Sequence, residues 1–339
     1  MKIGSNTEIP DRVFKFYSLE DYHVKAFLNH YLYLSHPSQL NDGMDACRDL
    51  LYLDSNSMTQ EVYERLKKQI ILKVPQLRTS RLSFESDSKN GYEALKEALY
   101  NVCFNFSGIV SFTDSKKSFF NSAMWAYYTN EEGFAIEFKP QKLLEGIMSN
   151  PINKQFVSLS YGKVKYKEEL EALNVKDIHT IDEIGTAIVF QKQKYWENEA
   201  EWRMYIESDL YLNKDKAYGR YIHYPVEAIE RICLGYKFWN KVSENRCNIK
   251  KDVWQYTVKN EYLPFVKKLL SLCNIVFMST KCFGRTYIYM NKKIARENPT
   301  PTRSFDYLCY SIEDNEITIE INEGKGISEY NEFSENYSK

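Results

Sequence analysis

The chain has 339 residues, of which 43% are hydrophobic and 27% are charged. This composition is typical of a folded globular protein and excludes collagen-like, coiled-coil and low-complexity chains. The formal net charge is −1, so the total charge does not indicate the class of partner.

The first predicted elements are short strands and helices. Residues 13–17 (VFKFY) are rich in β-forming side chains and predict a strand, a helix is expected over 20–29, and a second strand over 31–35. The next segment, HPSQLNDGMD, has the Pro, Asn, Asp and Gly content of a structured loop. Two amphipathic helices are then predicted from apolar residues at helical spacing: Val62, Leu66 and Ile70, and Tyr92, Leu95, Leu99 and Val102.

The middle of the chain predicts strands on either side of a helix. Strand-like alternation occurs over 108–112 and 133–138, and the helix between them carries Met124, Trp125 and Tyr128. A further helix is predicted to end near Tyr195, and residues 201–206 (EWRMYI) predict a strand. Alternation assigns the side chains of that strand to two faces: Trp202, Met204 and Ile206 inward, and Glu201, Arg203 and Tyr205 opposite.

The order of these elements lacks the regularity of repeated βαβ units. We therefore expect an α+β domain over 1–240, with a mixed, mostly antiparallel sheet and packed helices. A smaller, basic and helix-rich C-terminal α/β appendage is predicted over 241–305, and an acidic tail over 306–339. Residues 240–305 carry thirteen Lys or Arg against four acidic residues, and the tail carries nine acidic residues against two Lys. Within the tail, SIEDNEITIEI alternates like a strand.

Several kinds of site and location are excluded by missing patterns. The phosphate-binding GxxxxGK[ST] loop, GxGxxG, HExxH, GxSxG and an EF-hand loop are absent from the sequence. The five histidines lack ligand spacing and the seven cysteines form no CxxC pair, so we predict no metal site and reduced thiols. The sequence shows no apolar run of about 18 residues and no signal-peptide pattern, so a cytoplasmic protein without membrane contacts is expected.

Four segments carry polar residues in a specific order. They are FKFYS (14–18), LYLSHPSQLND (32–42), VSFTDSKKSFFNSAMWAYYTNEEGFAIEF (110–138) and KYWENEAEWRMYI (194–206). Over about residues 12–240 this combination resembles the bacterial domain-of-unknown-function family 2971. The sequence departs from the family at Gly43 and Met44, where Pro-Phe is usual, and at Tyr127, where His is usual.

The order of these segments is also similar to that of ADP-ribosyltransferases. This looser resemblance implies that Lys15 or Tyr17 contacts NAD, that Trp125 and Tyr128 stack on nicotinamide, and that Glu201 is the catalytic glutamate. NAD would be the substrate. The acceptor of ADP-ribose would be a protein or a nucleic acid.

Elementary chemistry is consistent with that assignment. Cleavage of the nicotinamide–ribose bond develops positive charge on the sugar, which a carboxylate such as Glu201 stabilises. Arg203, beside it on the strand, can hold this carboxylate ionised or bind the pyrophosphate of NAD. The loop residues Ser35, Asn41 and Asp42 are further candidates to contact NAD.

Ordinary structural roles remain open for the same residues. Glu197, Glu199 and Glu201 also fit the solvated start of an exposed strand, with Arg203 as a surface ion partner. Trp125 and Tyr128 lie three residues apart, which is equally typical of core packing, and the Asn41-Asp42 pair also fits a turn closed by side-chain hydrogen bonds.

The sequence thus predicts an NAD-consuming, ADP-ribosyltransferase-like enzyme, for example a bacterial toxin or phage-defence effector. Two alternatives involve no NAD chemistry. One is a protein that binds nucleic acid through the basic residues and aromatics of 241–305. The other is a metal-dependent nuclease with Asp42, Asp45 and Glu201 around Mg²⁺.

Overall fold

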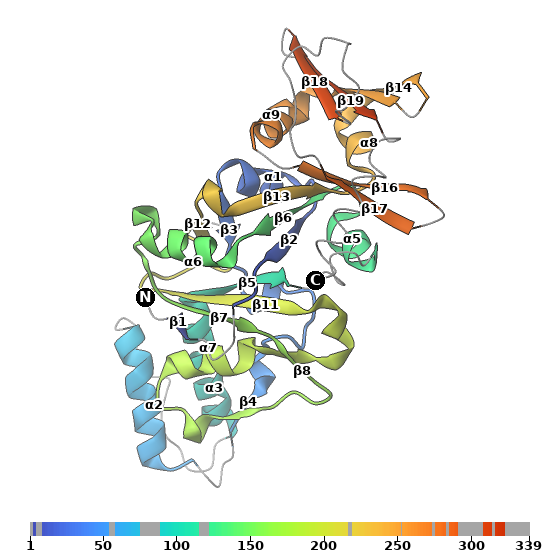
Figure 1. The fold of residues 1–339 in the computed structure, drawn as a ribbon. Coiled ribbons are helices and arrows are strands. Elements are labelled where there is room, and N and C mark those ends of the chain that lie inside the picture. The colour runs from blue at the N-terminus through green and yellow to red at the C-terminus, as the bar shows by residue number, and fades with distance from the viewer. Residues whose placement is uncertain are drawn as a thin grey trace. The chain divides into compact units, whose positions relative to one another are not determined.

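The computed structural model in Figure 1 groups the chain into two compact units, which are described separately. Unit 1 comprises Met1–Ile9, Tyr31–Phe112 and Ile147–His223, and unit 2 comprises Pro10–His30, Thr113–Gly146 and Tyr224–Lys339. The structure describes these residues: 3–4, 9–53, 58–74, 89–114, 122–215, 219–251, 253–272, 275–282, 285–290, 308–313 and 316–322.

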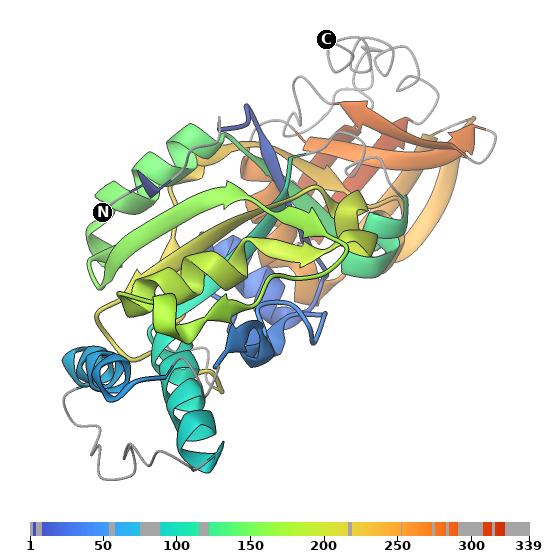
Figure 2. The same cartoon turned by 90° about the horizontal axis from the view of Figure 1, so that it is seen from below.

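The main strands of unit 1 lie in the order β1 (Ile3–Gly4), β7 (Phe156–Lys163), β11 (Glu201–Ser208) and β5 (Ser107–Thr113). β1 and β7 are parallel, whereas β7 and β11 are antiparallel and run side by side in Figure 2. Every residue of β11 is buried. The strand is therefore covered on both faces, including the face on which alternation places Glu201 and Arg203.

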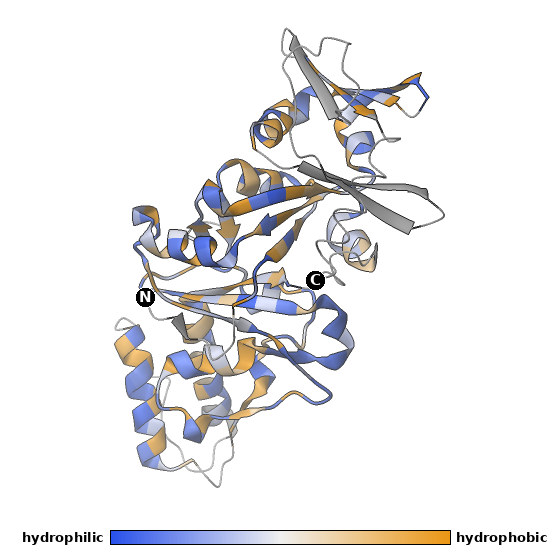
Figure 3. Ribbon diagram, viewed as in Figure 1, coloured by the Kyte–Doolittle hydropathy of each residue, from blue (hydrophilic) through white to orange (hydrophobic). Residues whose placement is uncertain are grey.

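Three helices supply much of the core of unit 1: α2 (Gln60–Lys73), α3 (Lys89–Asn105) and α7 (Ile181–Val189). The predicted amphipathic spacing of α2 and α3 is confirmed, because Leu66, Ile70, Leu95 and Leu99 are completely buried. In Figure 3, hydrophobic and hydrophilic residues alternate around the turns of α2.

Helix α7 packs directly on β11. A Cβ atom at Gly185 would lie 2.1 Å from the ring of Tyr205, so only glycine permits this close approach. Tyr205 shares its strand face with Glu201 and Arg203. The helix therefore covers the face that carries the predicted site residues, and it ends at Val189, whereas the sequence predicted a helix end near Tyr195.

Short elements complete unit 1. Three strand pairs are β3 (Tyr31–Tyr33) with β12 (Tyr221–His223), β4 (Leu51–Tyr52) with β9 (Leu173–Asn174), and β8 (Lys165–Lys167) with β10 (Gln191–Gln193). The single-turn 3₁₀ helices are η1 (Pro37–Gln39), η2 (Arg48–Leu50), η4 (Pro151–Asn153) and η5 (Val175–Asp177). A longer one, η6 (Lys194–Glu199), leads into β11.

The main strands of unit 2 lie in the order β2 (Val13–Tyr17), β6 (Phe134–Phe138), β13 (Ile229–Leu234), β16 (Ile275–Cys282) and β17 (Arg285–Met290). All neighbours are antiparallel except β13 and β16. The associated helices are α1 (Asp21–Leu28), α5 (Ser122–Thr129) and α6 (Pro140–Ser149). The predicted strand over 13–17 is confirmed with its exact bounds.

A second, four-stranded antiparallel sheet belongs to the C-terminal part of unit 2. Its order is β14 (Ser243–Lys250), β15 (Val253–Val258), β19 (Glu316–Asn322) and β18 (Leu308–Glu313). The helical elements of this region are η7 (Val226–Ala228), α8 (Phe238–Val242), η8 (Asn260–Tyr262) and α9 (Leu263–Ser271). The strand-like alternation predicted within SIEDNEITIEI is confirmed by β18 and β19.

The α+β class with a mixed, mostly antiparallel sheet and a smaller C-terminal part is confirmed. That C-terminal part contains an antiparallel sheet besides its helices, whereas the sequence indicated a helix-rich segment. The predicted boundaries 1–240, 241–305 and 306–339 stay a prediction, because the two units are assembled from segments that alternate along the chain. Among the described helices, none has the length and apolar character that crossing a membrane requires.

Candidate functional site

The side chain of Arg203 lies at the centre of a buried charged cluster in unit 1. Its Nε and Nη2 atoms donate to the two carboxylate oxygens of Glu201 at 2.7 and 2.9 Å. Its Nη1 and Nη2 atoms donate to the two oxygens of Asp45, and Nη1 also donates to the carbonyl of Val189 at 2.6 Å. A guanidinium has five N–H donors. All five are therefore used within the protein, and Arg203 is fully buried.

Lys192 is the second cation of the cluster. Its Nζ lies 2.6 Å from Oε2 of Glu199, 3.3 Å from Oε2 of Glu201 and 3.7 Å from Oδ2 of Asp45. The Arg203 network, defined as Asp45, Lys192, Glu199, Glu201 and Arg203, thus contains three carboxylates and two cations. Its formal charge is −1 when every member is ionised.

The pKa shifts in this network favour the ionised forms. Burial alone would raise the pKa of Glu201, but the charges of Arg203 and Lys192 outweigh burial and lower this pKa to about 2. Burial opposes the charge on Lys192 and Arg203 as well, yet the neighbouring carboxylates raise the pKa of both. Glu201 is therefore a carboxylate at neutral pH, with two cations in contact with it.

The local fold brings these side chains together. Alternation along β11 places Glu201 and Arg203 on one face. At the start of that strand the hydroxyl oxygen of Tyr166 accepts from the backbone N–H of Glu201 at 2.7 Å. Strand β10 positions Lys192 by pairing with β8, and Glu199 lies at the end of η6, where Ala200 adopts a left-handed conformation with φ of 44° and turns the chain into β11.

Two aromatic side chains lie at the solvent side of this network. Asp42 Oδ2 accepts from Trp196 Nε1 at 2.9 Å and from the Tyr195 hydroxyl at 3.4 Å. The Trp196 ring lies 4.8 Å from Lys192 Nζ, at cation–π distance. Tyr195 is 64% exposed, so the contacts made by η6 extend from the buried Lys192 to the protein surface.

The structure brings several predicted residues of unit 1 to this place. Glu201 and Arg203 are members of the network, and Asp42 lies at its rim, where its Oδ1 also accepts from Met44 N–H at 2.9 Å and closes a turn. Asn41 is exposed beside Asp42. The backbone of Ser35 pairs with Ile109 of β5 in an isolated bridge, and a role for Ser35 in NAD binding stays a prediction. The alternative of an exposed strand start with a surface ion pair is wrong, because Glu201 and Arg203 are buried.

The other predicted residues belong to unit 2. Trp125 is 1% exposed and meets the ring of Phe16 edge-on at 5.1 Å, while the ring of Tyr128 stacks on Phe16 at 6.3 Å. Tyr17 is buried and stacks on Phe134 at 5.2 Å, and Lys15 Nζ lies 5.6 Å from the Tyr17 ring. These contacts place Trp125 and Tyr17 in the core, and a role for any of the four in NAD binding stays a prediction.

Sequence reasoning missed Lys192, Tyr195 and Trp196 as members of the site. The expected helix through Tyr195 hid them, because a strand and a 3₁₀ helix occupy residues 191–199 instead. From the sequence, Asp45 was named only as a possible Mg²⁺ ligand in the nuclease alternative. The segment KQKYWENEAEWR did carry a signal, because it gathers three basic and three acidic residues around aromatic side chains within twelve positions.

The geometry bears on the metal alternative. In the ranges that the structure describes, no group of three or more His, Cys, Asp or Glu side chains is arranged to hold a metal ion. The carboxylates of Asp45 and Glu201 bind Arg203 instead. For the nucleic-acid alternative, residues 252, 273–274, 283–284 and 291–305 of the basic segment lie outside the described residues.

Residues 124–204 match a family model described as "Protein of unknown function (DUF2971)". The predicted resemblance to this family is therefore confirmed over that stretch, which includes Glu201 and Arg203, and the description assigns no activity. No curated protein and no solved structure matches the chain. The further likeness to ADP-ribosyltransferases stays a prediction.

Proposed function

We propose that the chain is an NAD-consuming, ADP-ribosyltransferase-like enzyme in which the Arg203 network stabilises positive charge on the ribose. The observation that supports this proposal is the charge balance of the network. Three carboxylates face two cations, and Asp42 adds a fourth carboxylate at the rim. With all groups ionised, the sum is −2.

An excess of fixed negative charge suits the chemistry of NAD cleavage. When the bond between nicotinamide and ribose breaks, its electron pair goes to the nicotinamide nitrogen and C1 of the ribose becomes positive. A carboxylate that is already ionised and oriented stabilises that charge without reorganisation during the reaction. Glu201 meets both conditions, because its pKa is about 2 and Arg203 holds both of its oxygens.

In this proposal NAD enters from the side of the network where Tyr195 and Trp196 lie. Glu201 is 4% exposed, so NAD reaches its carboxylate only after the side chains of η6 move aside. The exposed ring of Tyr195 offers a flat surface for the positively charged nicotinamide ring on that side. Opening at η6 is therefore part of the proposed catalytic cycle, with Trp196 released from Asp42.

The experiment that tests the proposal is nicotinamide release from NAD by the purified wild-type protein. A protein mixture, DNA and RNA are offered separately as acceptors, the nucleic acids because residues 240–305 carry an excess of nine positive charges by formal count. We expect release above the uncatalysed rate with at least one acceptor, accompanied by transfer of label from the adenosine part of NAD. Intact NAD with every acceptor, together with an unchanged melting temperature in saturating NAD, would refute the proposal.

A nucleic-acid-binding protein without NAD chemistry predicts a different result. Its affinity for DNA or RNA would fall steeply with salt and would survive Glu201→Gln, because phosphate contacts depend on Lys and Arg. Measuring DNA and RNA binding at two salt concentrations on the same samples separates the two functions.

A further inference from the structure

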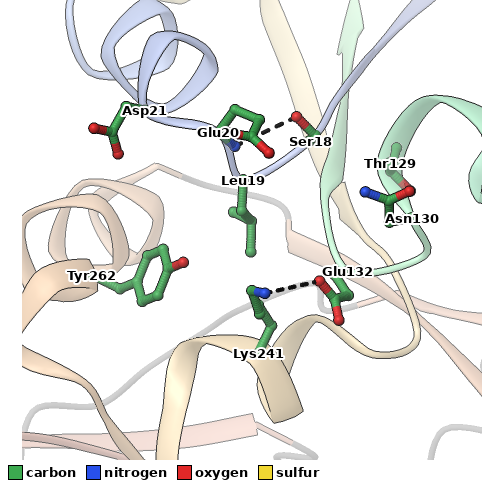
Figure 4. Close-up of a pocket in the computed structure, with 9 residues that line it drawn as sticks. All are labelled: Ser18, Leu19, Glu20, Asp21, Thr129, Asn130, Glu132, Lys241 and Tyr262. Carbon is green, nitrogen blue, oxygen red and sulfur yellow. Dashed lines mark hydrogen bonds and ion pairs between the residues drawn. The ribbon is translucent and has the colours of Figure 1, made fainter.

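A pocket in unit 2 is lined by none of the residues of the Arg203 network (Figure 4). It has a volume of about 310 Å³, close to the lower end of the range for small-molecule sites. Four segments of unit 2 line it with these residues: Ser18, Leu19, Glu20, Asp21, Thr129, Asn130, Glu132, Lys241 and Tyr262. All of them except Leu19 are polar, so the pocket is suited to a hydrophilic ligand.

The lining carries an excess of negative charge. Glu132 pairs with Lys241, whose Nζ lies 3.3 Å from its carboxylate. Glu20 and Asp21, at the start of α1, form no ion pair with any described residue, and both are exposed. The lining therefore contains three carboxylates and one lysine, which gives the pocket a formal charge of −2 when every group is ionised.

Lys241 is an example of an ammonium group bound by the carboxylates of this pocket. Its pKa is raised, chiefly because its side chain hydrogen-bonds Glu132, and the charges of Tyr262 and Glu20 act in the same direction. Burial raises the pKa of Tyr262, and the charges of Glu132 and Asp21 raise it further. The carboxylates of the pocket therefore stabilise the ammonium group of Lys241, and Tyr262 lines the pocket from another element (Figure 4).

The spacing of the carboxylates selects the kind of cation. In the described part of the chain no three acidic side chains converge as metal ligands do, so the pocket lacks the compact oxygen cage of a Ca²⁺ or Mg²⁺ site. Separated carboxylates around a hollow of this size match a ligand whose charges are spread over several bonds, and an aromatic side chain adds a favourable surface for such a group.

We propose that this pocket binds an organic cation that carries ammonium or guanidinium groups. Two sources share this chemistry: a free polyamine, and a Lys or Arg side chain of a protein partner. The proposal is independent of NAD chemistry, because none of the pocket residues belongs to the Arg203 network.

The test uses the full-length protein and calorimetric titration at low salt. The probes are putrescine, its neutral isostere 1,4-butanediol, and a short lysine-containing peptide with its lysine-acetylated counterpart. The test variant is Glu20→Gln with Asp21→Asn, which replaces two exposed carboxylates. The control is Glu145→Gln, an exposed acid on α6 of the same unit outside the pocket.

We expect putrescine or the lysine peptide to bind the wild type and the control equally. In the double variant the affinity should fall about fivefold or more, because two surface ion pairs are lost. Butanediol and the acetylated peptide should not bind. Stronger binding of putrescine identifies a polyamine as the source, and stronger binding of the peptide identifies a protein side chain. Absence of binding by both charged probes, or equal binding to the wild type and the double variant, would overturn the proposal.

Discussion

At the scale of single residues, Arg203 and Arg220 are both buried and each uses all five of its N–H donors, but on different acceptors. Arg203 uses them on two carboxylates and one carbonyl. Arg220 uses them on five backbone carbonyls, with no carboxylate in contact, and burial accordingly lowers the pKa of Arg220. Of these two arginines, Arg203 is the one with carboxylates around its guanidinium, which is why the proposed chemistry is assigned to the Arg203 network and not to Arg220.

The geometry around Arg203 predicts that lysine cannot replace it. Arg203→Lys keeps the charge but loses the planar fork that binds Glu201 and Asp45 bidentately. Leaving two buried carboxylates poorly paired should cost about 3–5 kcal/mol of unfolding free energy, measured by urea denaturation. The matched control is Arg48→Lys, since Arg48 is exposed and its Nε lies 4.0 Å from Asp49. A loss below about 1 kcal/mol in Arg203→Lys would contradict a tightly coupled network.

The lowered pKa of Glu201 predicts a pH dependence of stability. Its folded-state pKa of about 2 lies below the ordinary value of 4.5, so its contribution is complete above about pH 5 and is lost as the pH falls from 4.5 towards 2. The unfolding free energy of the wild type minus that of Glu201→Gln should therefore be constant near neutral pH and shrink in that acidic window. Urea titrations at several pH values measure it, and a difference that stays flat down to pH 2 would argue against an ionised, paired Glu201.

At the scale of elements, the contact between α7 and β11 fixes where the network forms. The close approach at Gly185 lets α7 end over β11, where the carbonyl of Val189 accepts from Arg203. The site thus depends on a glycine that takes no part in it. Without a side chain at that position, the helix reaches the strand face that carries Glu201.

A methyl group at Gly185 should destabilise unit 1. Alanine favours the helix by about 1 kcal/mol, but its Cβ would lie 2.1 Å from the buried ring of Tyr205, and overpacking costs about 1–3 kcal/mol. We expect a net loss in denaturant unfolding for Gly185→Ala. Gly43→Ala is the control, because no heavy atom lies within 4 Å of a Cβ at Gly43. A more stable Gly185→Ala protein would contradict the packing described for α7.

Local patterns predicted some elements better than others. The strand at Val13–Tyr17 and helices α2 and α3 follow from β-forming composition and from apolar periodicity, which depend on neighbours in sequence. Strand β10 is polar (QKQ) and forms because it pairs with β8, a contact that no local pattern encodes. The end of α7 was misplaced for that reason.

The same limit applies to the candidate site. Glu201 and Arg203 are two residues apart on a strand, so alternation predicted that they share a face. Asp45 lies 158 positions from Arg203 in sequence, and one sequence contains no signal that pairs them. The sequence of β11 also did not predict that both of its faces are buried. Its polar face is covered by α7, a separate segment of the chain.

At the scale of the whole molecule, Arg220 connects distant segments of unit 1. Its side chain donates to the carbonyls of Leu34, Phe104, Ser107, Leu212 and Asn213 at 3.0 to 3.2 Å. These partners come from three separate stretches of the chain. Arg220 therefore holds together the segments around β5 and β12 as a disulfide or metal would in other proteins.

Replacing Arg220 should lower the stability of unit 1 as a whole. Arg220→Met keeps much of the side-chain volume but leaves five carbonyls without their donor, so we expect a loss of more than about 3 kcal/mol. Hydrogen exchange should show faster exchange in peptides from 31–112 and 147–223, and little change in β15 and α9 of unit 2. Uniformly faster exchange in both units would indicate that Arg220 does not act within unit 1 alone.

The most direct test of the central claim compares two buried glutamates of β11. Glu201→Gln removes a carboxylate of the Arg203 network, whereas Glu207→Gln changes a carboxyl that burial already shifts towards its neutral form and that Ser158 contacts. Nicotinamide release from NAD is measured for both variants and for the wild type, per folded molecule. We predict a fall of about a hundredfold or more in Glu201→Gln and a rate near wild type in Glu207→Gln. Equal rates in all three proteins would contradict the assignment of NAD chemistry to the Arg203 network.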